Sequence, residues 1–212
     1  MIQKIFVIVF LISASLNQLS RASEWLRFRG ENGQGISSDS VSIEWSEKKN
    51  MKWQCKLPGP GSSSPVVSKG KVFVTCFSGV NEAQQDTSKL IRHVLCIDQK
   101  DGSIVWEHKI KAMQPDDPYR GFLTEHGYAS NTPVIDNGRV FAYLGKSGIH
   151  AYDFNGKKLW SKNLGTGSTR RKWGSAASPI VVGDNLVVSA AEESLAVYGL
   201  DPRTGKQNWI SE

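Results

Sequence analysis

Two stretches of this sequence gather side chains that could bind a ligand, and each stands just before a Ser-Pro or Thr-Pro pair. Their candidate binding residues are His126, Tyr128, Asn131, Arg170, Arg171, Lys172, Trp173 and Ser175. Such groups could hold a small anionic or planar molecule, or a protein, through charge-assisted hydrogen bonds and ring stacking. The alternative is that the basic run is a solvated loop and that the aromatic residues only pack it.

Catalytic chemistry has no support in the sequence. A nucleophile elbow, a phosphate-binding loop, a His-Glu-x-x-His pair and a Cys-x-x-Cys pair are all absent. Two acid pairs, Asp116-Asp117 and Glu192-Glu193, lack the pattern of a calcium loop, and we interpret them as solvated turns or edges. We therefore predict no catalytic residue and no metal ligand, and whether the protein is an enzyme stays open.

The elements that must position the candidate side chains are β-strands in a repeated order. Three segments open with a Ser-Pro or Thr-Pro pair, at Ser64, Thr132 and Ser178, and each continues with β-branched residues. A short Gly turn, a second strand, a third strand and another Gly turn lead to a fourth strand that carries tryptophan. Alternating apolar positions between such turns are typical of antiparallel hairpins, so each unit is predicted to be a four-stranded sheet.

Each unit ends in the same motif. A small residue is followed by a residue of any type and then by Asp, and a Gly then stands four positions before the Trp. The three copies are Asp98, Gly102 and Trp106, then Asp153, Gly156 and Trp160, then Asp201, Gly205 and Trp209. Trp53 extends the series at the same spacing of about 50 residues. The spacing predicts an all-β fold, a partial β-propeller with blades at 62–110, 130–164 and 176–212 and an orphan outer strand at 51–57.

The repeated element resembles the tryptophan-docking motif of the PQQ-like repeat propellers, the quinoprotein alcohol dehydrogenase-like superfamily. The copy "GLDPRTGKQNW" is the most similar, and the opening "EWLRFRGENGQGIS" is similar to the start of secreted bacterial members. The resemblance implies that the tryptophans pack between neighbouring blades. It also implies PQQ and Ca²⁺ as the cofactors of enzymatic members, although the adjacent cysteine pair that such enzymes often carry is missing here.

The long connections of the repeats are predicted to lie together. They span 77–92, 111–130 and 165–177, and an up-and-down strand order places all three on one end of the blades, opposite the short turns. Variable loops on one face of a rigid scaffold are where binding usually occurs. We therefore expect a protein or small-molecule ligand at this long-loop face.

Residues 1–22 have the layout of a secretory signal peptide, with Lys4 before an apolar run from Ile5 to Ile12 and a small-x-small triplet that ends at Ala22. The run is shorter than the roughly 20 apolar residues that a spanning helix needs. We therefore predict export to the periplasm or the exterior, no integral membrane segment after cleavage, and an N-terminal extension over 23–50.

Charge and cysteine content limit the partners and the redox chemistry. A net charge of +6 does not indicate nucleic-acid binding. Cys55, Cys76 and Cys96 have neither the number nor the spacing of a disulfide scaffold or a zinc site. Cys76 and Cys96 could pair across neighbouring strands in an oxidising compartment, and the alternative is that both are buried free thiols.

Three functions stay open. The first is a binding or protein-interaction scaffold in the cell envelope or exterior. The second is a PQQ-dependent dehydrogenase whose catalytic blades are missing from this sequence. The third is an outer-membrane protein assembly factor of the propeller type, against which the lack of a cysteine near the cleavage site counts. Because propellers have about four to eight blades, we expect the ring to be completed by a longer chain or by several copies.

Overall fold

The computed structural model describes residues 24–83, 86–112 and 116–212, and within them the chain forms three four-stranded antiparallel sheets. The predicted all-β fold of propeller blades is therefore confirmed. The first sheet contains β1 (Val66–Ser68), β2 (Lys71–Ser78), β3 (Ile91–Asp98) and β4 (Ile104–Lys111). The second contains β5 (Val134–Asp136), β6 (Arg139–Tyr143), β7 (Ile149–Asp153) and β8 (Lys158–Lys162). The third contains β9 (Ile180–Val182), β10 (Asn185–Ala190), β11 (Ala196–Leu200) and β12 (Gln207–Ser211).

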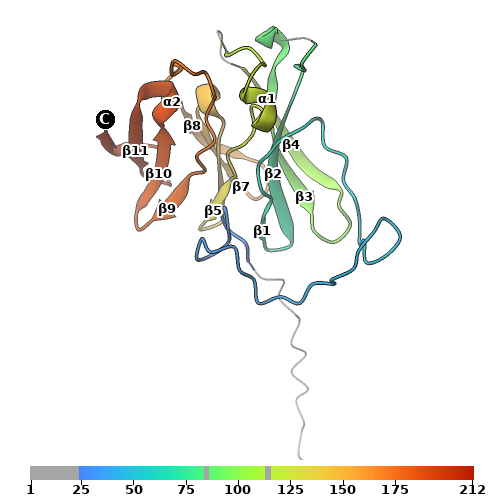
Figure 1. Ribbon diagram of the computed structural model, residues 1–212. Helices are drawn as coiled ribbons and strands as arrows, with labels where there is room; N and C mark the ends of the chain where they lie inside the picture. Colours follow the sequence, from blue (N-terminus) through green and yellow to red (C-terminus); the bar gives the residue numbers. More distant parts are fainter. Residues whose placement is uncertain (1–23, 84–85, 113–115) are drawn as a thin grey trace, which may run out of the picture.

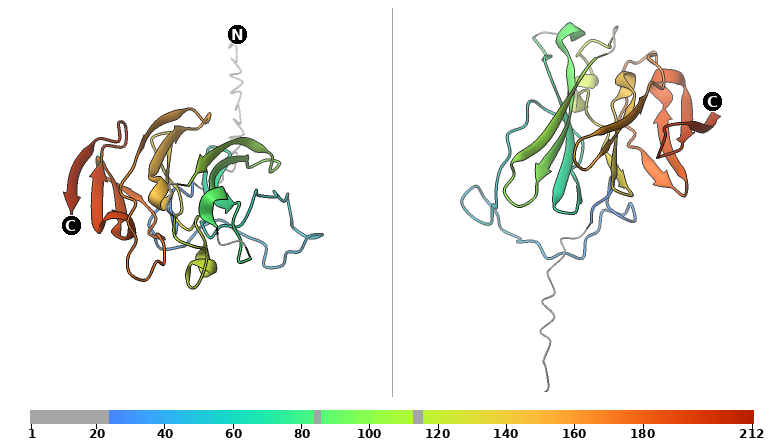
Figure 2. Two further views of the ribbon diagram at one scale, coloured as in Figure 1. Left: turned by 90° about the horizontal axis from the view of Figure 1, so that it is seen from above. Right: turned by 180° about the vertical axis from the view of Figure 1, so that it is seen from behind.

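Each sheet is a meander in which sequential strands are neighbours. The tight turns explain this order: Asn137 and Gly138 between β5 and β6 have φ of 44° and 73°, the paired positive values that a two-residue hairpin requires. The short innermost strands β1, β5 and β9 contact one another in sequence. Figure 2 shows from above that the three sheets stand side by side as an arc of blades.

The core lies between the blades as well as within them. Phe141, Ile149 and Leu186 belong to one buried cluster that joins the second and third sheets. Phe73 and Val140 belong to another that joins the first and second sheets. Large apolar side chains on alternating strand positions thus fill the spaces between blades, as the period-two pattern of the sequence requires.

Tryptophans connect neighbouring blades. The Trp106 indole N–H donates to the Phe154 carbonyl (3.1 Å), and the Trp160 indole N–H donates to the Pro202 carbonyl (3.1 Å) of the next blade. A Cβ at Gly156 would approach the Trp106 ring to 2.8 Å, so the turn has to carry glycine for the ring to lie flat on it. Trp106 and Trp160 therefore each pack on the Asp-to-Gly turn of the blade that follows.

The small residue at the start of the repeated element has a physical reason. Cys96, Ala151 and Gly199 each lie directly opposite the Trp of the same blade in the strand ladder. A larger side chain at these positions would compete with the indole ring for the same face of the sheet. The Asp two residues later orders the turn, as where Asp201 Oδ1 accepts the Arg203 backbone N–H at 2.7 Å.

The prediction of a strand at 51–57 is wrong. These residues are all described, and none of them lies in a strand. Strand assignment requires ladder hydrogen bonds, and this segment faces the side of the first blade rather than the edge of a sheet. Its side chains pack as a blade neighbour would: the Trp53 indole N–H donates to the Gln99 carbonyl (2.7 Å), and the ring lies on Gly102.

The segment 24–50 lies at the end of the blades that carries the short turns (Figure 1). It forms isolated bridges and no strand. Trp25 exchanges two 2.8 Å backbone hydrogen bonds with Val67 in β1, and the Leu26 carbonyl accepts the Ile135 N–H of β5 at 2.8 Å. Residues 25 and 26 therefore connect the inner strands of the first two blades.

All three cysteines lie in the described residues and are free thiols. Cys76 is opposite His93 and Cys96 is opposite Phe73 in the β2–β3 ladder, so the two cysteines belong to different cross-strand residue pairs. They also pack in different hydrophobic clusters on opposite sides of the sheet. Of the two alternatives left open by the sequence, the structure has the buried free thiols.

The predicted signal peptide at 1–22 lies outside the described residues. Among the helices that are described, none has both the length and the apolar character needed to cross a membrane.

Candidate functional site

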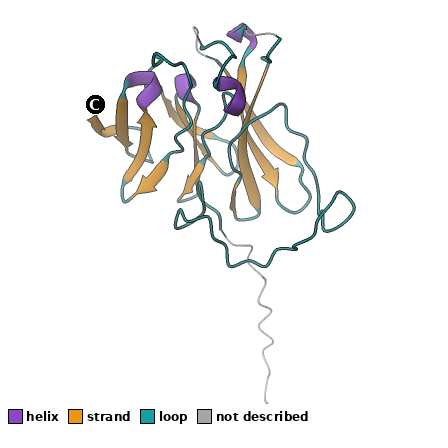
Figure 3. Cartoon of the chain, in the orientation of Figure 1, coloured by secondary structure: helices purple, strands orange, loops and turns teal. Residues whose placement is uncertain are grey.

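The long connections gather on one end of the molecule. The segment between β2 and β3 carries η1 (Thr87–Lys89), and the segment between β4 and β5 carries α1 (Leu123–His126). The same end holds η2 (Gly145–Ser147) and α2 (Ala191–Ser194), together with the connection between β8 and β9. Figure 3 shows these helical turns above the strands, opposite the segment 24–50. We call this end the long-loop face.

A buried charge network lies beneath the long-loop face. Arg92 Nη1 of β3 is 2.9 Å from Asp116 Oδ2, and Lys146 Nζ of η2 is 3.0 Å from Asp117 Oδ2. Ser168, in the connection to the third blade, donates its hydroxyl to Asp117 Oδ1 at 2.8 Å and accepts from Lys146 Nζ at 2.7 Å. We call these five residues the acid clamp, because the adjacent acids connect groups from two blades and a third long loop.

The four charged side chains of the acid clamp are almost completely buried, whereas Ser168 is exposed. The side chains of Arg92 and Asp116 are 4% and 3% exposed, and those of Lys146 and Asp117 are 8% and 9% exposed. Removing one partner from such a pair leaves a buried charge without compensation, which typically costs about 3–5 kcal/mol. The network therefore holds the loop 116–120 in one position against the blades.

A second buried acid lies beside the clamp. The Tyr143 hydroxyl donates to Glu193 Oε2 at 2.7 Å. Burial raises the pKa of the Glu193 carboxyl above its ordinary range, and the hydrogen bond from Tyr143 opposes this only in part. Burial also raises the pKa of Tyr143, so the phenol keeps its proton and acts as the donor.

The space enclosed by these groups is small. A cavity of about 20 Å³ lies between Arg92, Lys146 and Glu193, and Tyr128, Asn131 and Ser175 line it as well. This volume is enough for about one water molecule, whereas pockets for small ligands are typically about 300–1,000 Å³. The buried part of the site is therefore a structural support, and any partner has to bind on the surface above it.

The candidate residues divide into a buried group and an exposed group. Asn131 Nδ2 donates to the Ala177 carbonyl at 2.8 Å, and Tyr128 donates its hydroxyl to the Asp117 carbonyl. His126 links the two long connections: its Nε2 is 2.7 Å from the Trp173 carbonyl. The exposed group consists of Arg170, Arg171, Lys172 and Trp173.

The interpretation of the acid pairs as solvated turns is wrong, because the Asp116 side chain, Asp117 and Glu193 are all buried. Arg92 and Lys146 were not among the residues predicted from the sequence. One signal was present: Arg92 interrupts an apolar strand, and a charge in such a position has to find a partner.

The described residues do not fit the cofactor set that the fold family implies. No cluster of three or more His, Cys, Asp or Glu side chains in the described ranges could hold a metal ion. The cysteines are separated along the chain, and the cavity described above is far smaller than a tricyclic quinone. No step through PQQ or Ca²⁺ is therefore assigned to these residues.

A family model described as outer membrane protein assembly factor BamB matches residues 87–212. A curated relative, the outer membrane protein assembly factor BamB of Moranella endobia (strain PCIT), is 20% identical over 82% of this chain and 50% of its own length. The chain thus spans about half the length of the curated relative that it matches.

Two solved structures resemble this chain. Quinohemoprotein alcohol dehydrogenase from Comamonas testosteroni has a TM-score of 0.50 and 18% identity, over 75% of this chain and 22% of its own. BamB from Moraxella catarrhalis has a TM-score of 0.44 and 15% identity, over 78% of this chain and 56% of its own. The likeness to the dehydrogenase, at this identity, is a likeness of fold alone.

Proposed function

The chain belongs to the family of outer membrane protein assembly factor BamB, among the PQQ-like repeat propellers, and from this we propose that it is an exported protein-interaction scaffold that acts in the assembly of outer-membrane proteins. Its partners bind the long-loop face. The single observation that carries this proposal is the exposed aromatic surface there: Phe122 and Trp173 are 53% and 41% exposed, above a buried charge network that fixes the loops.

The long-loop face is better suited to binding a protein than to catalysis. Interaction surfaces need exposed apolar anchors on a rigid support, and the long-loop face supplies both. An enzyme site needs reacting groups around a space for substrate, and the cavity under this face has room for only about one water. The dehydrogenase alternative has only the fold in its favour, and fold does not determine activity.

Site-specific photocrosslinking in Gram-negative cells tests the proposal. A photoreactive phenylalanine analogue replaces Phe122 in the full chain, and the matched control places it at Ile43, which is 97% exposed in the segment 24–50 at the opposite end. We expect crosslinks from position 122 to outer-membrane proteins or to their assembly machinery, identified by mass spectrometry, and none from position 43. Equal crosslinking from both positions, or none from position 122, would contradict the assignment of the face.

A further inference from the structure

The long-loop face carries a paired aromatic surface. The rings of Phe122 and Trp173 have centroids 4.9 Å apart, and the two residues come from different long connections. Both rings remain largely exposed, although a soluble surface usually places such side chains singly. Exposed aromatic residues in contact are typical of the anchors in protein interfaces.

The aromatic pair is held in place before any partner arrives. The Trp173 carbonyl contacts His126 Nε2 at 2.7 Å, while His126 Nδ1 is 2.6 Å from the Ser130 hydroxyl. A carbonyl oxygen can only accept, so the contact with Trp173 places a proton on His126 Nε2, and the Ser130 hydroxyl donates to the His126 carbonyl at 2.9 Å. Gly174, with φ of 75°, turns the chain against buried Leu123 of α1. A surface fixed in this way loses little conformational entropy on binding.

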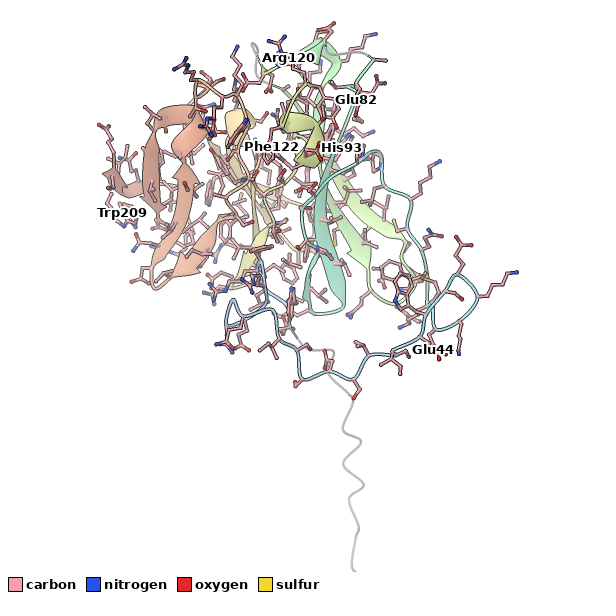
Figure 4. The ribbon with its side chains drawn as sticks, in the orientation of Figure 1. Glu44, Glu82, His93, Arg120, Phe122 and Trp209 are labelled. Atoms are coloured by element: carbon pink, nitrogen blue, oxygen red, sulfur yellow. The ribbon has the colours of Figure 1, made fainter. Side chains whose placement is uncertain are left out.

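Basic residues lie next to both members of the aromatic pair along the chain. The Arg171 guanidinium stacks on the Trp173 ring, 4.6 Å from its centroid. Arg120, Arg170 and Lys172 are exposed nearby in the chain, and within the described ranges none of these four cations has a carboxylate in ion-pair range. Figure 4 shows Arg120, Phe122 and Glu82 at this end of the molecule.

The acids at this face do not balance the cations. Glu82, Asp86 and Glu125 are exposed, and half-buried Glu192 accepts the Thr169 hydroxyl. When Lys89 of η1 is included, five exposed cations stand against these four acids, which leaves a positive surface around an apolar centre. Such a surface attracts an anionic partner and repels a cationic one.

We propose that Phe122, Trp173 and Arg171 form a docking site, here called the aromatic platform, for an acidic segment of a partner protein that carries an apolar side chain. The apolar side chain packs on the Phe122 and Trp173 rings, and the flanking carboxylates pair with Arg171 and the neighbouring cations. This inference rests on the proposed function and specifies the chemistry of the partner. A phosphate-rich membrane surface offers negative charge as well, and it is an outcome that the test distinguishes.

Fluorescence anisotropy with labelled synthetic peptides tests the aromatic platform in the purified full chain. The probe is a short peptide of Asp and Glu with a central Leu, and the comparison peptides replace Leu by Ser or every acid by Lys. We expect saturable binding of the first peptide, at least about tenfold weaker binding of the other two, and a loss of affinity as salt rises from about 50 to 300 mM.

Variants separate the platform from a general charge effect. F122A and R171E should each weaken binding about tenfold or more, because one removes an anchor and the other reverses a central charge. The matched controls I43A and K49E change one exposed apolar and one exposed cationic residue at the opposite end, and they should bind as the unchanged protein does. Circular dichroism melting curves check that each variant is folded.

Three results would overturn the inference: no saturable peptide binding, equal binding of the Leu and Ser peptides, or binding only to phosphatidylglycerol vesicles. These results are distinct from the failure of the proposed function. Crosslinks from position 122 without acidic-peptide binding would leave the scaffold in place and remove only the partner chemistry. Peptide binding without crosslinks to outer-membrane proteins would keep the docking site for an acidic segment and remove the proposed role in outer-membrane protein assembly.

Discussion

Glu193 is the residue whose ionisation should affect folding most visibly. Its folded pKa is raised by burial, with Glu192 adding to the shift and Tyr143 and Arg92 opposing it. A carboxyl that holds its proton more tightly in the folded state stabilises the fold at low pH. That contribution is lost as pH rises from the ordinary glutamate range through the folded value.

Replacing Glu193 by Gln should therefore flatten the dependence of stability on pH. The amide oxygen can still accept the Tyr143 hydroxyl, but it never has to be charged inside the protein. Urea unfolding at several pH values should show the variant gaining stability relative to the unchanged protein as pH rises. Glu192→Gln is the control, because that side chain is less buried. Parallel pH profiles for the unchanged protein and Glu193→Gln would show that Glu193 does not titrate with folding.

The cysteines should differ sharply in reactivity. Burial raises the pKa of the Cys76 and Cys96 thiols to about 11, and both side chains are fully buried. The thiolate is the reactive form, so neither thiol should react in the folded state near neutral pH. Titration with a disulfide reagent should modify half-buried Cys55 first and all three thiols only after denaturation. Rapid reaction of two or more thiols in the folded protein would contradict the packing described here.

The acid clamp connects side chains that are far apart in the chain. Ser168 and Asp117 are separated by 51 positions, and Arg92 and Asp116 by 24. Local sequence patterns contain no information about such pairs, which explains why the acids were interpreted as solvated. The strands, the turns and the tryptophan motif were predictable because each repeats within one blade, where alternation and Gly turns act locally.

Asp117→Asn should destabilise the protein by about 3 kcal/mol, because it leaves the buried Lys146 charge without its carboxylate. Adding Lys146→Met should restore part of the loss, since the unpaired charge is then gone. Glu44→Gln is the control: it removes an exposed ion pair with Lys49 and should change stability by less than about 1 kcal/mol. The measurement is urea unfolding, and equal midpoints for Asp117→Asn and Glu44→Gln would mean that the clamp does not hold the loop.

Replacing single tryptophans should show how far the stability of the protein depends on contacts between neighbouring blades. Trp160 packs on Gly205 of the next blade, whereas Trp209 is 39% exposed and has no following blade among the described residues. Trp160→Ala should cost about 3 kcal/mol, the usual range for loss of a packed aromatic ring, and Trp209→Ala about 1 kcal/mol or less. Thermal melting of the two variants gives the comparison. Similar losses would indicate that the ring stabilises its own sheet rather than the contact between blades.

At the scale of the whole molecule, the blades are joined differently at their two ends. The acid clamp and the paired aromatic residues connect them at the long-loop face, and residues 25 and 26 connect β1 to β5 at the other end (Figure 1). The sequence predicted an extension over 23–50 but not this contact. Backbone pairing through Trp25 and Leu26 uses groups that every residue has, and so it leaves no pattern of side chains to recognise.

Deleting residues 24–30 should therefore loosen the first two blades without unfolding them. The Val67 and Ile135 amides lose the carbonyls of Trp25 and Leu26, and Leu26 leaves a cluster that contains Val66 and Ile135. Hydrogen exchange followed by mass spectrometry should show faster exchange in β1 and β5, while β9 to β12 stay protected. The matched deletion of 39–45 removes exposed loop residues and should leave exchange in β1 and β5 unchanged. Equal protection of β1 and β5 in both deletions would show that the segment lies against the blades without holding them together.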